Sequence, residues 1–249
     1  MLQSFLFNQK GWFMQLEYLG ILMSIFMINL VLSGDNAVVI AMASRNLPPK
    51  QQRAAILMGS AGAIIFRVIL TVIIVFLLKI PFLQAVGGLL LVYIAVKLLV
   101  KEEEGEECEA ASSLTQAIKV IIFADLIMSL DNTLAIAAVS KGNWLMLIIG
   151  LATSIPIIIF CSQILLYLMK KFPIIIYIGS GILAWTAGKM LVEDKKVSQF
   201  LHQYYSSNNI AGIIEIAVPV VITFFVIAYG WHSNSRAAGH CEAVGKEKA

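Results

Sequence analysis

Two stretches of the sequence, NLVLSGDNAVVIAMAS (Asn29–Ser44) and DLIMSLDNTLAIAAVS (Asp125–Ser140), match each other at a constant offset of 96 residues. Seven of their sixteen positions are identical, and a Ser-x-Asp-Asn pattern occurs in both. Apolar composition alone produces chance matches among Leu, Ile and Ala, but Asp and Asn are scarce in such segments. The repeat therefore indicates an internal duplication. The alternative is a duplicated motif with a merely structural role. It fits less well, because the repeated Asp and Asn residues cost free energy within a membrane span.

The rest of the chain is also strongly apolar. Of its 249 residues, 59% are hydrophobic and 13% are charged, whereas a soluble domain carries about 25% charged residues. The net charge is only +3, and its basic residues are scattered rather than striped, so we expect no nucleic acid partner. The three cysteines have neither metal-site nor disulfide spacing. The composition indicates an integral membrane protein whose surroundings are the lipid bilayer.

Seven segments are long and apolar enough to cross a membrane as helices, which takes about 20 residues each. They are Leu16–Ser44, Ala54–Leu78, Phe82–Val100, Leu114–Val139, Trp144–Met169, Ile174–Val192 and Ile210–Trp231. The expected fold class is therefore all-α, a polytopic membrane protein with seven transmembrane helices. Each half of the duplication holds three spans, so the second half is inverted in the membrane. Inverted repeats of this kind place substrates near the midplane, at the interface between the repeats.

The predicted organisation is a single transmembrane domain over residues 1–231 and a cytoplasmic tail over residues 232–249. The domain comprises repeat one (16–100), an acidic linker (101–113), repeat two (114–192), an outer loop (193–209) and the seventh helix (210–231). The side of the membrane that holds the amino terminus collects 6 Lys and Arg residues, and the opposite side collects 11. The excess of positive charge on cytoplasmic loops predicts an amino terminus outside and a carboxy terminus inside.

Three aspartates, Asp35, Asp125 and Asp131, lie deep within the predicted spans. Each costs about 2.5–3.5 kcal/mol at the centre of a helix, so an acid in this position is by default a functional residue. If the repeat brings Asp35 and Asp131 together, a shared proton or a bound cation must relieve their repulsion. Arg67, inside the second span, is a candidate counter-ion to one of the aspartates. Snorkelling and helix packing are the alternatives for this arginine.

Helical geometry limits which polar residues of the second motif can share an ion. At 100° per residue, Asp125, Ser129 and Asn132 fall within about 60° of one another, whereas Asp131 points roughly 120° away from Asp125. The same face recurs in the first motif at Asn29, Ser33 and Asn36. Two arrangements stay open. Either a helix unwinds locally, which Gly34 permits, or the aspartates face their symmetry mates while the polar face meets other helices.

Oxygen ligands from Asp and Asn, with neither Cys nor His in the motifs, suit hard divalent ions such as Mn²⁺, Mg²⁺ or Ca²⁺. The duplicated segments SGDNAVVIAMA and SLDNTLAIAAV resemble the TerC family of integral membrane proteins, and the chain looks like its YjbE-like branch of metal transporters. The resemblance extends to about residue 231. Members of this family are linked to manganese export from the bacterial cytoplasm, in some cases for secreted proteins, and belong to the LysE-type transporter group.

The resemblance implies Mn²⁺ as a transported ion and no prosthetic group. The metal site that it implies consists of Asp35, Asn36, Asp131 and Asn132, with Asp125 as a further acid and Asn29 as its counterpart in the first half. We therefore expect Mn²⁺ efflux across the bacterial plasma membrane through this Asp/Asn site, and no enzymatic activity. A second copy of the chain and the secretion machinery are further candidate partners.

Two other functions are consistent with the same residues. One is a membrane scaffold that delivers metal to secreted proteins. The other, less favoured, is an intramembrane aspartyl protease, because two membrane aspartates can share a proton. Against the protease, each motif Asp is followed by Asn, and the Gly-x-Gly-Asp pattern of such proteases is absent.

Overall fold

The structure, a computed structural model, describes residues 19–20, 23–24, 27, 34–77, 80–100, 113–139, 144–204 and 208–247. Within these ranges, side chains are not described at 74–75, 131–139, 144–155, 204, 208–209 and 236–247. No strand occurs in the described part, which forms eight helices. They are α2 (Gly34–Ser44), α3 (Pro49–Leu77), α4 (Leu83–Leu99), α5 (Leu114–Val139), α6 (Trp144–Lys171), α7 (Ile174–Glu193), α8 (Lys195–Tyr204) and α9 (Asn208–Glu247). The all-α fold class is confirmed.

The helix bounds lie close to the predicted spans. Helix α5 coincides with its predicted span, and α4, α6 and α7 differ from theirs by at most two residues at either end. Helix α3 begins at Pro49, which is favoured in the first turn because the missing N–H of proline has no helical partner there. The first predicted span, Leu16–Ser44, lies mostly outside the described residues, with α2 as its last part.

Two segments predicted as loop or tail contain helix. Residues 195–204 of the predicted outer loop form α8, and α9 continues past the predicted seventh span to Glu247. Asp194 begins α8 because its Oδ1 accepts hydrogen bonds from the backbone N–H groups of Lys196 (2.9 Å) and Val197 (3.4 Å). The sequence analysis did not recognise this N-cap because Asp194 stood in an acidic stretch assigned to a loop.

Three described segments are long and apolar enough to cross a membrane, and Leu83–Leu99 is a shorter apolar helix. The three are Pro49–Ile73, Ile174–Glu193 and Ile210–Ser235. Large apolar side chains are exposed along them, as expected of a surface that faces lipid rather than water. Phe224 on α9, for example, is 74% exposed. The prediction of seven spans stays a prediction, because parts of the other segments are not described.

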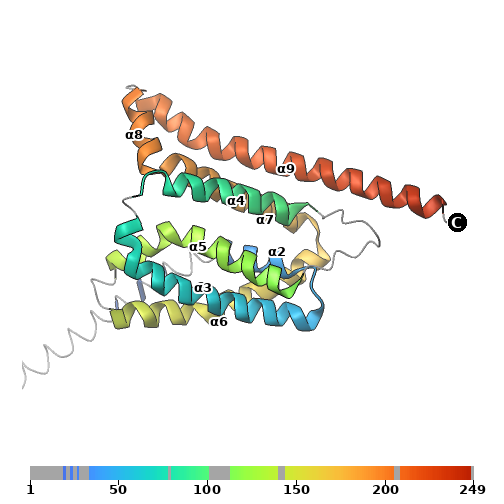
Figure 1. Cartoon of the computed structure of the whole chain (residues 1–249), viewed down its shortest axis with the longest axis horizontal. Helices are drawn as coiled ribbons and strands as arrows, with labels where there is room; N and C mark the ends of the chain where they lie inside the picture. Colours follow the sequence, from blue (N-terminus) through green and yellow to red (C-terminus); the bar gives the residue numbers. More distant parts are fainter. Residues whose placement is uncertain are drawn as a thin grey trace, which may run out of the picture.

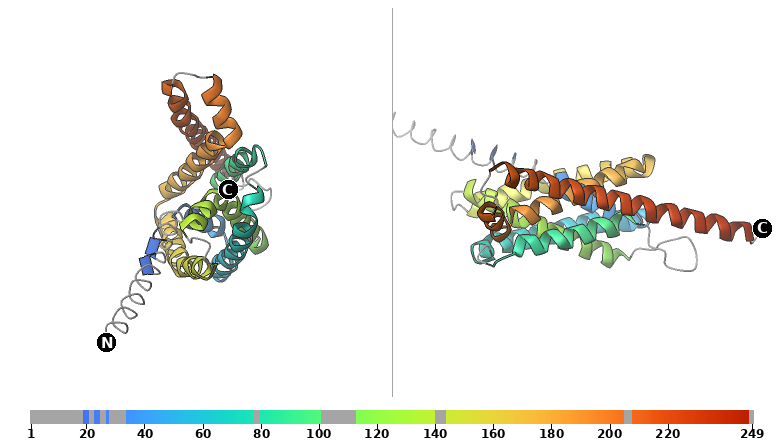
Figure 2. Two further views of the ribbon diagram at one scale, coloured as in Figure 1. Left: turned by 90° about the vertical axis from the view of Figure 1, so that its left-hand side faces the viewer. Right: turned by 90° about the horizontal axis from the view of Figure 1, so that it is seen from above.

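The helices lie in layers, with α9 along one side, α4 and α7 beneath it, then α2 and α5, and finally α3 and α6 (Figure 1). The view from above shows that α9 continues beyond the ends of the other helices (Figure 2, right). The helix pairs with the most extensive contact are α3 with α5, α4 with α7, and α7 with α9.

The contacts between the first three helices (α2, α3 and α4) and the next three (α5, α6 and α7) correspond when the two sets are exchanged. When α2, α3 and α4 are exchanged for α5, α6 and α7, the α2–α6 contact maps onto the α3–α5 contact, and α2–α7 maps onto α4–α5. The α2–α5, α3–α6 and α4–α7 contacts map onto themselves. Each motif helix, α2 or α5, therefore packs against a helix of the other half.

Small residues bring the outer helices close together. A Cβ atom added to Gly188 of α7 would lie 2.5 Å from the Cα atom of Pro219 in α9. Between α4 and α7, the buried Ser180 hydroxyl donates a hydrogen bond to the Ala95 carbonyl at 3.0 Å. Gly and Ser at helix contacts are typical of membrane bundles, where close backbone approach replaces the hydrophobic driving force.

The Gly188–Pro219 contact predicts a local sensitivity to added volume. Gly188→Ala should destabilise the protein by about 1–3 kcal/mol, because the rigid proline backbone cannot yield to the new methyl group. Thermal unfolding of the detergent-solubilised protein measures the change. Gly212→Ala is the matched control, because no atom lies within 4 Å of its added Cβ. A Gly188→Ala variant as stable as this control would contradict the described packing of α7 on α9.

Candidate functional site

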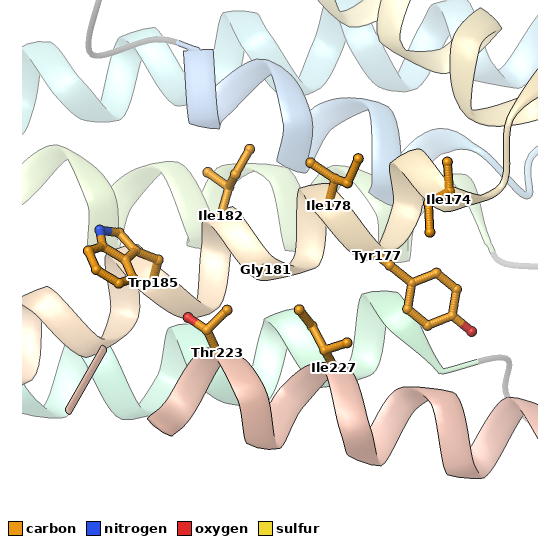
Figure 3. A pocket seen from close by; sticks show the side chains of 8 residues that line it. All are labelled: Ile174, Tyr177, Ile178, Gly181, Ile182, Trp185, Thr223 and Ile227. Carbon is orange, nitrogen blue, oxygen red and sulfur yellow. The ribbon is translucent and has the colours of Figure 1, made fainter. Parts of the chain in front are cut away.

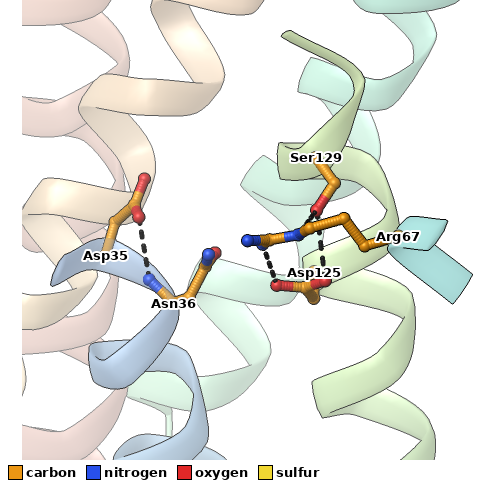
Figure 4. Close-up of polar contacts among 5 residues, drawn as sticks. All are labelled: Asp35, Asn36, Arg67, Asp125 and Ser129. Atoms are coloured by element: carbon orange, nitrogen blue, oxygen red, sulfur yellow. Dashed lines mark hydrogen bonds and ion pairs between the residues drawn. The ribbon is translucent and has the colours of Figure 1, made fainter. Parts of the chain in front are cut away.

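A closed polar network links α3 and α5 in the interior of the bundle (Figure 4). The guanidinium of Arg67 donates from Nη2 to Oδ1 of Asp125 at 2.6 Å and from Nε to Oγ of Ser129 at 2.9 Å. The Ser129 hydroxyl in turn donates to Oδ2 of Asp125 at 3.1 Å. Arg67 is only 3% exposed, and Ser129 is fully buried. All three residues belong to one hydrogen-bonded unit that excludes solvent.

The local sequence explains how this network forms. Asp125 and Ser129 are four residues apart, so they lie one above the other on the same face of α5. Gly59, two turns before Arg67 on α3, allows the close approach, since a Cβ at this position would lie 2.8 Å from Cγ2 of Ile121 on α5. The predicted Asp125–Ser129 face is thus confirmed. The hypothesis that Arg67 is a counter-ion is also confirmed, and its burial excludes snorkelling.

Asn36 of α2 faces this network from the other side. Figure 4 shows its side chain pointing from α2 toward the guanidinium of Arg67. Asn36 is 2% exposed, and within the described part of the chain neither its Nδ2 nor its Oδ1 has a hydrogen-bond partner. Buried side-chain amides are almost always hydrogen-bonded, because leaving one unpaired costs about 1–3 kcal/mol. An unpaired buried amide of this kind is free to bind a ligand or an ordered water molecule.

Asp35 lies next to Asn36, at the start of the described part of α2. Its Oδ1 accepts a hydrogen bond from the backbone N–H of Asn36 at 2.8 Å. Figure 4 shows the Asp35 carboxylate on the side of Asn36 that lies away from Arg67.

The structure brings three of the candidate polar residues to Arg67, places Asp35 beside them and leaves three untested. Asn36, Asp125 and Ser129 lie around the Arg67 guanidinium, whereas the Asp35 carboxylate lies on the far side of Asn36 and accepts a hydrogen bond from its backbone. Asn29 lies entirely outside the described residues, and the side chains of Asp131 and Asn132 are not described. Helix α5 runs unbroken through the second motif, so local unwinding is not found there. Among the described residues, no cluster of three or more His, Cys, Asp or Glu side chains is present.

Ser60 is a buried polar residue that the sequence analysis missed. It is 2% exposed, and no hydrogen-bond partner of its Oγ is found among the described residues. Ser60 precedes Arg67 by seven residues, or nearly two helical turns, so both lie on the same face of α3. The sequence signal that could have identified Ser60 is its seven-residue spacing from Arg67, the single arginine of the predicted second span.

A cavity in the outer layer has different chemistry from the polar network. It has a volume of about 490 Å³ and lies between α7 and α9, where Ile178, Ile182 and Ile227 line it (Figure 3). None of its lining residues is charged. The hard oxygen ligands lie instead between α2 and α5, which is where a cation could be bound.

Comparison with known proteins places the chain in a family. Residues 14–238 match the family described as "Integral membrane protein TerC family". The chain is 44% identical over 214 residues to the uncharacterized membrane protein YjbE of Bacillus subtilis, covering 86% of this chain and 95% of that one. It is 30% identical over 164 residues to YceF of the same organism, covering 62% and 63% of the two chains. No solved structure gives a significant match.

The chain belongs to the TerC family and is a multi-pass integral membrane protein. The resemblance predicted from the duplicated Ser-x-Asp-Asn motifs is therefore confirmed. The name of the first relative states that it is a membrane protein and does not state a substrate.

The buried ion pair predicts a strong and unequal response to mutation. Arg67→Met should lower the free energy of unfolding by about 3–5 kcal/mol, because it leaves the Asp125 carboxylate buried and uncompensated. Adding Asp125→Asn to this variant should restore much of the loss, since both charges are then absent. Thermal unfolding in detergent, arranged as a double-mutant cycle, measures the coupling.

The Lys189–Glu193 pair is the matched control for this cycle. Its charged atoms are 3.5 Å apart, but both side chains are about half exposed (52% and 51%). Glu193→Gln should change stability by less than about 1 kcal/mol, because water screens an exposed pair. Equal effects of Arg67→Met and Glu193→Gln would contradict the burial of the Arg67 network.

Proposed function

We propose that this TerC family member exports a divalent metal cation, most favourably Mn²⁺, from the bacterial cytoplasm through a site between its two motif helices. The observation that carries the proposal is the buried, unpaired amide of Asn36 beside the Arg67–Asp125–Ser129 network. Its Oδ1 is an available ligand, with the Asp35 carboxylate next to it. Amide, hydroxyl and carboxylate oxygens are the ligands that hard divalent cations prefer.

The charged residues that lie deep within the predicted spans, away from the span ends, also favour a divalent cation. Three aspartates and one arginine, Asp35, Asp125, Asp131 and Arg67, carry a formal net charge of −2. Unbalanced charge is costly in the bilayer core, so this excess needs protons or a cation. One divalent ion neutralises it fully, whereas an anion would increase the imbalance. The single arginine, Arg67, is therefore not enough to make this an anion site.

The helix contacts support the proposed inverted repeat with seven spans. Because α2 packs on α6 and α5 packs on α3, each motif helix is anchored in the opposite half of the chain. A rocking movement of one half against the other would change the separation of α2 and α5, and with it the geometry of their ligands. Alternating access by such movements is the general mechanism of inverted-repeat transporters. The excess of Lys and Arg on the carboxy-terminal side supports the proposed orientation.

The polar network also bears on the protease alternative. An aspartyl protease needs two carboxylates that share a proton. Asp125 is paired instead with Arg67 and Ser129, so its carboxylate is already held by two donors. Asp125 is therefore not available for such a pair, whereas a pair of the motif aspartates Asp35 and Asp131 stays a prediction, because the Asp131 side chain lies outside the described residues.

Flux through reconstituted protein tests the proposal. Proteoliposomes that enclose a Mn²⁺-sensitive dye should show metal-dependent quenching with the native chain. Asp35→Asn and Asn36→Leu should each reduce the initial rate about tenfold or more, because the first removes a negative charge and the second an oxygen ligand from the path. Asp131→Asn should do the same if its side chain joins the site.

The control is Glu215→Gln, a surface acid on α9 that is exposed and pairs only weakly with His202 (3.6 Å). This variant should transport at the native rate. Native protein that binds Mn²⁺ without any flux would overturn export and support the metal-delivery scaffold. Peptide cleavage that is lost in Asp35→Asn would instead support the protease. Flux that survives Asp35→Asn and Asn36→Leu would contradict the assigned site.

A further inference from the structure

The Arg67 guanidinium already uses the oxygen atoms that α5 offers to a cation. Oδ1 of Asp125 and Oγ of Ser129 each accept a hydrogen bond from Arg67, and Oδ2 of Asp125 accepts one from Ser129. Each of these three described oxygens is thus held by a donor within the network. A metal ion cannot coordinate the same lone pairs while these donors remain in place.

The guanidinium also occupies the space that a bridging ion would need. Figure 4 shows it between the Asn36 side chain of α2 and the Asp125 carboxylate of α5. An ion that takes ligands from both motif helices at this level must lie where the guanidinium lies now. The Arg67 guanidinium is therefore located at the position where the proposed substrate ion would bind.

The ion pair is present in only one half of the duplication. At the offset of 96 residues, Asp125 corresponds to Asn29, which is neutral. The following helices align with Gly59 opposite Gly150, an offset of 91, which places Arg67 opposite the buried Ile158. Acid and base are thus both absent from the first half. Because both charges are replaced together by neutral residues in the other half, we interpret Arg67 and Asp125 as one functional unit within two otherwise similar repeats.

We infer that Arg67 is a tethered cation that competes with the metal ion for Asp125 and Ser129. The inference rests on the proposed function, and it assigns Arg67 a role in setting metal affinity. When no metal is bound, the guanidinium holds the α5 oxygens and keeps the buried carboxylate paired. When metal binds between α2 and α5, it displaces the guanidinium from these oxygens. Binding and the Arg67–Asp125 pair are then mutually exclusive states, linked by a coupling free energy.

Competition with Arg67 lowers the apparent affinity of the native protein for the metal ion and aids release of the ion. Metal binding must break the Arg67–Asp125 ion pair, so the measured dissociation constant of the metal is higher than the intrinsic value. The same pair re-forms as the metal leaves, which favours an empty site over a trapped ion. Arg67 is therefore a positioning and affinity-setting residue rather than a direct ligand.

Metal affinity and metal-dependent stability test the inference together. Arg67→Met should bind Mn²⁺ about tenfold or more tightly than the native chain in equilibrium dialysis, because the competing cation is gone. Its melting temperature should be low in metal-free buffer and rise with Mn²⁺ by more than that of the native chain, because the metal replaces the missing charge. A merely structural arginine predicts a loss of stability that Mn²⁺ does not reverse.

Two further variants keep the test decisive. Arg67→Lys retains the charge, and hence a pairing partner for Asp125, but loses the fork that bonds Ser129 and Asp125 together. It should fold and bind Mn²⁺ several-fold more tightly than the native chain. The Arg67→Met/Asp125→Asn double variant should lose the extra stabilisation by Mn²⁺. Glu193→Gln is the control and should match the native chain in both measurements.

The outcomes separate this inference from the proposed function. Native protein that transports Mn²⁺, with equal or weaker binding by Arg67→Met and Arg67→Lys, would overturn competition and leave transport intact. Native protein with neither flux nor a Mn²⁺-dependent melting shift would overturn the proposed function itself. Tighter binding by both arginine variants, together with native flux, supports both.

Discussion

A charge in the dry interior of a membrane protein must be paired, and the described architecture depends on one such pair. Arg67 and Asp125 are both buried, so neither charge can be neutralised by water. Their contact fixes the rotation of α3 and α5 about their axes, because any other rotation would leave a charge facing lipid or apolar side chains. Gly59 and the hydroxyl of Ser129 make the close, hydrogen-bonded approach of these helices possible. The Asn36 amide then faces an interior that is already polar.

The pair also explains how a nearly symmetric frame can hold an asymmetric site. The contacts between the two halves correspond when the halves are exchanged, and each motif helix packs against the opposite half. Under the proposed function, the shared Ser-x-Asp-Asn motifs would supply similar oxygen ligands from both halves, whereas the arginine is supplied by one half alone. Such a ligand set with a single tethered cation would have two ways to balance its charge. Exchange between them is the kind of two-state behaviour on which transport depends.

Much of the fold could be predicted from the sequence because membrane spans are determined by length and apolarity. Helix α5 was predicted to the residue, and the Asp125–Ser129 face followed from helical periodicity alone. Helix α8 was missed because a short amphipathic helix has no span-length signal, and its N-cap, Asp194, looked like one more loop acid. The extension of α9 was missed because a polar helix beyond a span resembles a tail in composition.

The sequence predicted which residues belong to the candidate site, but it did not predict which of them contact one another. Burial cost alone identified Asp35, Asp125 and Arg67 as unusual, because each is charged within a span. Their pairing could not be deduced, since it depends on the register of α3 against α5, which the small residues at their contact determine. The unpaired state of Asn36 and the buried hydroxyl of Ser60 are properties of packing, which no local pattern encodes. The roles of Asp131 and Asn132 remain predictions from the repeat.

The most direct test of the account is to locate the metal itself. Crystals of the native chain grown with Mn²⁺, measured at the manganese absorption edge, should give one anomalous peak between α2 and α5. The account predicts oxygen ligands from Asn36 and Asp125 at this peak and an Arg67 guanidinium that no longer contacts Asp125. A peak elsewhere in the molecule, or a bound ion that leaves the Arg67–Asp125 pair intact, would contradict it.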